Sequence, residues 1–130
     1  MSKKTIVPVP GVSEKFDVPL SFVVKADKFL FVSGVPPIDH KTGALVRGDI
    51  ETQTRASLST IKYALESAGS SLDNVVKATI YITNSAYYKI VNDVYREFFS
   101  KDFPARTFVA MSSWPMEFDI EIECVALSGD

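Results

Sequence analysis

Apolar residues typical of strands gather in two short runs between residues 21 and 34. The runs SFVVKA at 21–26 and FLFVSG at 29–34 are rich in strand-forming residues, and the polar pair Asp27-Lys28 separates them. Two such runs with a two-residue break predict a β-hairpin. Turn chemistry follows in PPIDHKTG at 36–43. The first twenty residues are predicted to be irregular, because they are punctuated by Pro8, Pro10, Gly11 and Pro19.

After these strands the spacing of the apolar positions changes to that of a helix. One apolar face recurs at three- and four-residue steps and predicts a helix over 50–68, with Leu58, Ile61, Leu65 and Ala68 on that face. Asp49 is suited to cap its N-terminus, and Gly69 to end it. The next run, VVKATIYIT at 75–83, is continuously apolar enough to predict a strand buried on both faces.

A second helix is predicted over 86–99, capped by Asn84 or Ser85 and ended before Pro104. Its inner face is expected to carry Tyr88, Val91, Tyr95 and Phe98. Two last strands, at 106–113 and 118–127, are joined by a loop around Trp114-Pro115.

The predicted order is β-β-α-β-α-β-β, which is the order of an α+β fold and is expected to form one domain over 1–130. Where a helix lies between strands in the sequence, the chain is expected to cross over the sheet, and some of the strands are expected to pair in parallel. Two helices can cover only one face of a shared sheet, so the other face must meet solvent or another subunit.

The last strand carries a mixed pattern on that second face. One side is apolar, with Ile120, Ile122, Cys124 and Ala126, and the other side holds Glu121, Glu123, Val125 and Leu127. Two carboxylates followed by two apolar residues fit an oligomer interface with a polar site at one end. They fit a half-wetted surface strand equally well.

Composition narrows the classes of function. The 130 residues include 14 basic and 16 acidic side chains, so the net charge is −2, and no basic run exists to displace counterions from a nucleic acid. One cysteine and one histidine, Cys124 and His40, provide no intrachain disulfide and no zinc set, so neither metal nor cofactor is expected. We expect a cytoplasmic protein, since prolines interrupt the apolar start MSKKTIVPVPG and no run is long enough to span a bilayer.

The stretch FPARTFVAMSSWPMEFDIEIECVAL at 103–127 carries the candidate chemistry. Arg106 opens a strand, and its planar guanidinium matches a carboxylate ligand. Its alternative role is a structural salt bridge to Glu121 or Glu123. Glu121 in turn could serve as a base, as a group that positions water, or as the partner of Arg106.

Other candidates have simple alternatives. Ser33-Gly34 ends a strand, where the glycine either lets the backbone approach a ligand or only begins a turn. Tyr88 opens the second helix as a pocket wall or a core residue. Cys124 is expected to be an inert core thiol, and His40 an exposed loop residue.

These residues also carry a resemblance. The chain resembles the reactive intermediate deaminase (Rid, YjgF-type) family of enamine/imine deaminases through FLFVSG…PIDxxTG at 29–43, the segments at 48–83 and 91–99, and FPART…FDIEIECVAL at 103–127. The PAR-[ST] and IEIExxA elements are the most specific, and both are intact. The resemblance covers nearly everything after residue 20.

The resemblance implies a homotrimer with a chorismate-mutase-like (bacillary type) fold and sites in clefts between subunits. Arg106 would hold the substrate carboxylate, and Glu121 with the backbone carbonyl of Phe108 would place the attacking water. Ser33, Gly34 and Tyr88 would line the same cleft. The implied reaction is hydrolysis of 2-imino or 2-enamino acids to 2-keto acids and ammonia, with no cofactor or metal.

The chain departs from the family pattern at its N-terminal pocket motif. Leu20 replaces a tyrosine, Phe22 replaces a glutamine, and Trp114 stands in the last turn where leucine is usual. These changes predict a pocket lined in part by Leu20 and Trp114 that prefers larger or more apolar substrates. A trimeric module that binds small carboxylates without turnover is the alternative, and an endoribonuclease is disfavoured by the acidic composition.

Overall fold

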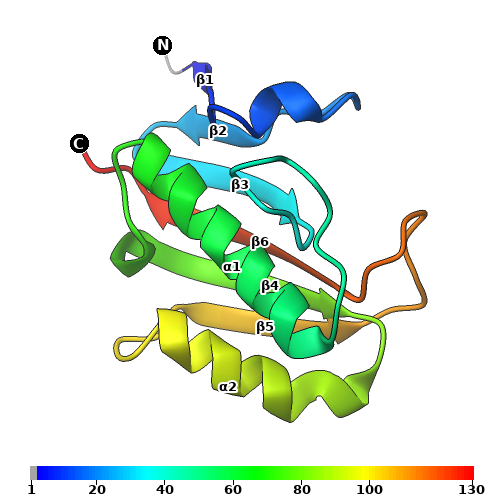
Figure 1. Ribbon diagram of the computed structural model, residues 1–130. Coiled ribbons are helices and arrows are strands. Elements are labelled where there is room, and N and C mark those ends of the chain that lie inside the picture. Colours follow the sequence, from blue (N-terminus) through cyan, green and yellow to red (C-terminus); the bar gives the residue numbers. More distant parts are fainter. Residues whose placement is uncertain (1–2) are drawn as a thin grey trace.

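Residues 3–130 are described by the computed structural model, in which six strands form one sheet and two helices lie across it (Figure 1). The helices are α1 (Ile50–Ser67) and α2 (Tyr88–Phe98), and single 3-10 turns occur at Ser13–Lys15, Leu72–Asn74 and Ser85–Tyr87. The strands are β1 (Lys4–Val7), β2 (Val23–Ala26), β3 (Phe29–Val35), β4 (Val75–Ile82), β5 (Ala105–Ala110) and β6 (Ile120–Leu127).

The sheet has the order β1-β2-β3-β6-β4-β5. Four of its five pairings are antiparallel, and β4 with β5 is parallel. A parallel pair cannot be joined by a tight turn, so α2 occupies the connection between β4 and β5. The crossover was predicted at the first helix, and it is confirmed there: β3 and β4, which α1 connects, lie on either side of β6 and both run antiparallel to it. The parallel pairing itself is that of β4 with β5, an edge strand that lies beside α2.

Local signals account for the predicted hairpin and the ends of the first helix. Asp27 adopts φ 56°, a conformation that aspartate tolerates, and the register Ala26↔Phe29 closes the turn around it. The Asp49 side chain accepts a hydrogen bond from the Thr52 backbone N–H, and Gly69 with φ 80° follows α1. These three predictions are confirmed.

Both helices lie on the same side of the sheet (Figure 1), as predicted. The apolar side of β6 is buried beneath them, with Ile120, Ile122, Cys124 and Ala126 at most 4% exposed. Two buried hydroxyl groups of α1 fix it to the chain after β3: Ser57 Oγ donates to the Val35 carbonyl and Thr60 Oγ1 to the Ile38 carbonyl. The core therefore sits between the helices and one sheet face.

Four predicted features need correction. The residues before 20 are not wholly irregular, because β1 pairs with β2 along its length. The strand at 75–83 is not buried on both faces: Ala78, Ile80 and Ile82 are buried, while Val76 is 39% exposed. Tyr88 is 49% exposed rather than on the inner face of α2, and Val94 is buried instead. The last two strands are shorter, with β5 ending at Ala110 and β6 beginning at Ile120.

The sheet face opposite the helices, which we call the free face, is divided into an apolar and a polar half. Cross-strand register brings Phe31 beside Val125 and Phe29 beside Leu127, and Phe31, Phe29 and Leu127 are each more than a third exposed. At the β4–β6 end, Tyr81 pairs with Glu121 and Thr79 with Glu123. Among the described residues, no helix is both long and apolar enough to cross a membrane.

Candidate functional site

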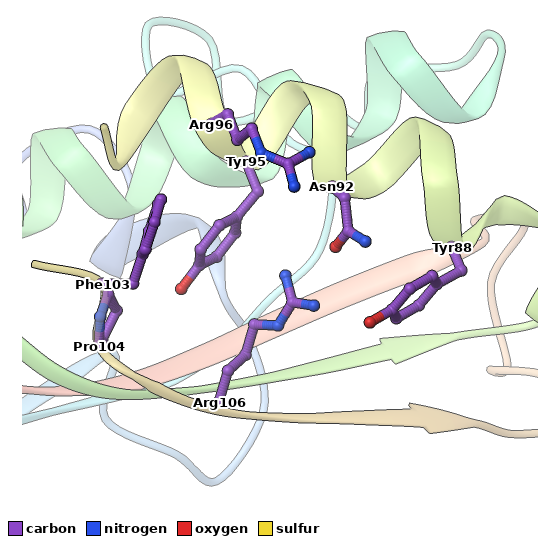
Figure 2. Close-up of a pocket in the computed structure, with 7 residues that line it drawn as sticks. All are labelled: Tyr88, Asn92, Tyr95, Arg96, Phe103, Pro104 and Arg106. Atoms are coloured by element: carbon purple, nitrogen blue, oxygen red, sulfur yellow. The ribbon is translucent and has the colours of Figure 1, made fainter. Parts of the chain in front are cut away.

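A pocket of about 230 Å³ opens between α2 and the start of β5 (Figure 2). Helix α2 contributes side chains that lie one turn apart and so share a stripe, and β5 and the segment before it contribute the other wall. The lining residues are Tyr88, Asn92, Tyr95, Arg96, Phe103, Pro104 and Arg106. The pocket thus has two arginines and no carboxylate in its wall.

Arg106 is held among aromatic rings. Its guanidinium carbon lies 5.0 Å from the ring centre of Tyr95, 5.8 Å from that of Tyr88 and 5.5 Å from that of Phe108. Tyr88 and Phe108 meet edge to face, with ring centres 4.7 Å apart. Such rings attract a cation while leaving its in-plane N–H donors available to a ligand. Small Ala78, which pairs with Arg106 across β4 and β5, leaves the space these side chains occupy.

Two buried polar atoms in this region have no hydrogen-bond partner: Asn92 Oδ1 and Tyr95 Oη. Tyr95 is only 4% exposed, and burial raises the pKa of its hydroxyl to about 12, against a smaller lowering by the charge of Arg106. Its hydroxyl therefore remains a neutral donor at physiological pH. Buried polar groups are normally paired, so both atoms are suited to a ligand.

Glu121 lies on the free face of the sheet, where it pairs in register with Tyr81 of β4. It is half-buried, and the pKa of its carboxyl is raised, first by desolvation and second by the nearby charge of Glu123. Glu123 accepts a hydrogen bond from Tyr81 Oη at 2.8 Å. A carboxyl with a raised pKa in a half-buried place is suited to handling a proton.

Gly34 lies directly under Glu121. A Cβ atom on Gly34 would come within 2.3 Å of Glu121 Oε1, so the glycine provides the room in which this carboxyl lies. Strand β3 continues through Gly34 to Val35, and the interpretation of Gly34 as the start of a turn is therefore wrong. Ser33, the residue before it, donates from Oγ to the carbonyl of Ser21 at 2.7 Å.

The three residues at which this sequence departs from the family pattern lie away from the pocket at Arg106. Leu20 is 49% exposed ahead of β2, and Phe22 is buried in the core and stacks on Phe16. Trp114 packs against Phe118, with ring centres 4.7 Å apart, in the loop before β6. That loop is held by Gln53, whose amide donates to Asp119 Oδ2 and accepts from the Asp119 backbone N–H.

The predicted site residues therefore form two groups. Arg106, Tyr88 and Phe108 lie on the helix side of the sheet, because Arg106 is in register with Ala78 and Ala78 with Cys124. Glu121 and Gly34 lie on the free face, and Ser33 precedes Gly34 on β3. The ion pairs recorded in residues 3–130 do not include Arg106, so a salt bridge to Glu121 or Glu123 within the chain is not formed.

Sequence reasoning did not identify Asn92 and Arg96 as site residues, and it assigned Tyr95 only to the core. The signal was available, because Tyr88, Asn92 and Tyr95 follow three- and four-residue steps along one helix and end opposite Arg106. Cys124 is buried as predicted, and burial raises the pKa of its thiol to about 12. Within residues 3–130, His, Cys, Asp and Glu side chains form no group of three that could hold a metal.

The fold and this pocket define a small α+β protein with a cationic, aromatic-walled site on an edge strand. The family model described as "Endoribonuclease L-PSP" matches residues 14–128. The chain belongs to this family, which confirms the resemblance to the Rid proteins.

Relatives and a solved structure agree with this assignment. A RutC family protein of Pyrococcus horikoshii is 46% identical over 83% of this chain and 86% of its own. A bovine protein named 2-iminobutanoate/2-iminopropanoate deaminase is 34% identical over 85% of this chain and 81% of its own. The crystal structure of a Rid family protein from Yersinia pestis superposes with a TM-score of 0.89 at 37% identity, covering 96% of this chain and 99% of that one.

Proposed function

We propose that the protein is a hydrolytic deaminase that converts 2-imino or 2-enamino acids to 2-keto acids and ammonia. The observation that carries the proposal is the environment of Arg106, whose guanidinium is held by three aromatic rings at the wall of a pocket without carboxylates. Support comes also from the bovine relative, which is named for the deamination of 2-iminobutanoate and 2-iminopropanoate.

In this proposal Arg106 binds the substrate carboxylate. A guanidinium forms two parallel hydrogen bonds to a carboxylate, and this geometry fixes the orientation of the adjacent C2 atom. The aromatic rings restrict the motion of the guanidinium before the ligand arrives, so less entropy is lost on binding.

The hydrolysis needs little from the protein. An enamine first gains a proton at C3 and loses one from nitrogen to become the imine. Water then adds to the electrophilic C2 of the imine and gives one proton to nitrogen, which forms a carbinolamine. The hydroxyl group of the carbinolamine gives its proton to nitrogen as the C–N bond breaks and the C=O bond forms, which releases ammonia and the keto acid. Glu121 and the backbone carbonyl of Phe108 would orient the water, and the raised pKa of Glu121 suits a group that accepts and returns a proton. Orientation of two reactants can account for most of such an acceleration.

Arg106 and Glu121 lie on opposite faces of one sheet, so we propose that the complete site forms between copies of the chain in a homotrimer. The exposed apolar half of the free face, with Phe29, Phe31 and Leu127, supports such packing. One copy would provide Arg106, Tyr88 and Phe108, and its neighbour Ser33, Gly34 and Glu121. Leu20 would reach this site only from the neighbouring copy.

The expected preference for larger or more apolar substrates is part of this proposal. Tyr88, Phe103 and Pro104 provide apolar walls next to Arg106, which gives the preference a basis in the pocket itself. Trp114 lines a separate hollow rather than the pocket at Arg106. Its contribution to the preference would therefore also have to come from the neighbouring copy.

The test is keto acid release from imines that an amino-acid oxidase generates in place, with Arg106→Ala beside the wild-type protein. We expect kcat/KM to fall about thirtyfold or more, because truncating one partner of a desolvated charge pair costs roughly 2–5 kcal/mol. Lys62→Ala is the control: Lys62 pairs with Glu66 on the surface of α1 and is absent from the pocket wall.

Equal rates for Arg106→Ala and wild type would overturn the role of Arg106. If the folded wild-type protein accelerates release from no imine yet binds keto acids through Arg106, the chain is a carboxylate-binding module instead.

A further inference from the structure

A second cation shares the pocket of Arg106. Arg96 extends from α2 toward Asn92 over the same hollow into which Arg106 rises from β5 (Figure 2). Like charges that line one small cavity repel each other when the cavity is empty, and an anion between them relieves that repulsion. Two guanidinium groups in one wall therefore need an explanation beyond the binding of a single carboxylate.

The contacts of Arg96 leave its guanidinium available. Its Nη1 lies 3.6 Å from Asp93 Oδ1, which is longer than a hydrogen bond, and its side chain is 66% exposed. The other oxygen of Asp93 is taken by Lys89, whose Nζ lies 2.9 Å from Oδ2. Asp93 lies outside the pocket wall and is shared between Arg96 and Lys89, so it offsets the charge of Arg96 only in part, and the wall itself holds no carboxylate.

The unpaired polar atoms lie in the same region. Tyr95 Oη, buried and without a partner, is directed into the space between α2 and β5, and Asn92 stands beside it on the helix (Figure 2). A neutral tyrosine hydroxyl can donate to an anion, and an amide offers both a donor and an acceptor. Apolar contacts in the remaining wall, from Tyr88, Phe103 and Pro104, suit methylene groups.

We propose that the preferred ligand carries two anionic groups, its 2-carboxylate on Arg106 and a second anionic group at Arg96. This inference rests on the proposed function and keeps its preference for larger substrates, but it replaces the apolar end of the substrate side chain by an anionic one. The preferred substrates are then the imines of acidic amino acids or similar dicarboxylic acids. A pocket of about 230 Å³ has room beyond a carboxylate bound at Arg106. Its apolar walls would contact the carbon chain between the two charged ends.

Two stable keto acids of equal length separate this proposal from simple carboxylate binding. 2-Oxopentanoate and 2-oxoglutarate both have five carbons and differ in a terminal methyl or carboxylate. We expect calorimetry at low salt to give a dissociation constant about two- to fivefold smaller for 2-oxoglutarate, the effect of one partly exposed ion pair. The preference should shrink as salt is added.

The variant Arg96→Gln should remove the preference and bring the ratio of the two dissociation constants to about one, while Arg96→Lys should retain part of it. Lys62→Gln is a matched control, because Lys62 is 50% exposed, pairs with one carboxylate, that of Glu66, and does not line this pocket. It loses the same charge and should keep the wild-type ratio.

The outcomes separate the two proposals. A wild-type ratio near one, or a ratio that Arg96→Gln leaves unchanged, overturns the second anionic group. The imine of norvaline is the substrate that would give 2-oxopentanoate. If it is nevertheless hydrolysed through Arg106, the deaminase function stands without the second anionic group. If neither keto acid binds and no imine is hydrolysed, both proposals are wrong.

Discussion

Arg106 illustrates how much of a residue's role depends on its surroundings. In sequence it is one arginine at the start of a strand, and its spacing alone favours a structural ion pair. In the fold it lies within 5–6 Å of three ring centres and has no ion pair among the described residues. Its donors are thus positioned for a partner from outside the chain.

Glu121 gives a pH-dependent prediction. Its carboxyl pKa is raised in the folded chain above the ordinary value of 4.5, so the folded protein binds the proton more tightly than the unfolded one. As the pH rises from the ordinary pKa through the raised pKa, ionisation of Glu121 therefore lowers the free energy of unfolding. This loss of stability persists at higher pH. Glu121→Gln should be more stable than wild type at pH 7, and the difference should close as pH falls toward 4.5.

The measurement is the free energy of unfolding against pH, at one protein concentration. Glu14→Gln, on an exposed turn, should follow the wild-type curve. A wild-type protein more stable than Glu121→Gln at pH 7 would contradict the prediction.

At the scale of elements, the contact of β3 with β6 sets the position of Glu121. Gly34→Ala would put a methyl group where Glu121 Oε1 now lies, and the flexible carboxyl would turn away. We expect stability to change by less than about 1 kcal/mol, because only the end of one side chain moves. Imine hydrolysis should fall by up to about a hundredfold, since a displacement of about 1 Å at the reacting groups can cost that much.

A double mutant tests whether the loss of hydrolysis in Gly34→Ala is caused by the displacement of Glu121. In a Glu121→Gln background, Gly34→Ala should cause little further loss of rate, because the group it displaces is already gone. Losses that multiply would show that Gly34 acts through something other than Glu121.

Elements defined by local chemistry could be predicted from the sequence. Asp27 and Gly69 tolerate positive φ, and Asp49 caps a helix with its own side chain, so each fixes a boundary within a few residues. Strand β1 was missed because prolines follow it closely and its pairing with β2 comes from distant residues. No local signal reports such a pairing.

The site was predicted only in part for the same reason. Tyr88, Phe108 and Arg106 do meet, because a helix and the strand after it pack together. Trp114 was expected at the same pocket, but its loop folds toward the start of α1, where Gln53 holds Asp119. The side of the sheet on which Arg106 and Glu121 lie depends on register across three strands, which the spacing in sequence does not reveal.

For the whole molecule, the free face predicts association. We expect sedimentation to give a mass near three times 14.4 kDa. Phe31→Glu should dissociate the assembly, because it puts a charge on the exposed apolar half beside Val125. Ile90→Glu is the control, since Ile90 is also more than a third exposed but lies on α2, away from the free face. A wild-type monomer at micromolar concentration would contradict this prediction.

The placement of Arg106 and Glu121 on opposite faces has a genetic consequence. In an assembly that completes each site from two copies, a chain lacking Arg106 and a chain lacking Glu121 are each defective alone. When the two are mixed, some interfaces join an intact Arg106 to an intact Glu121 and recover a working site. Two inactive alleles could then complement each other within one oligomer.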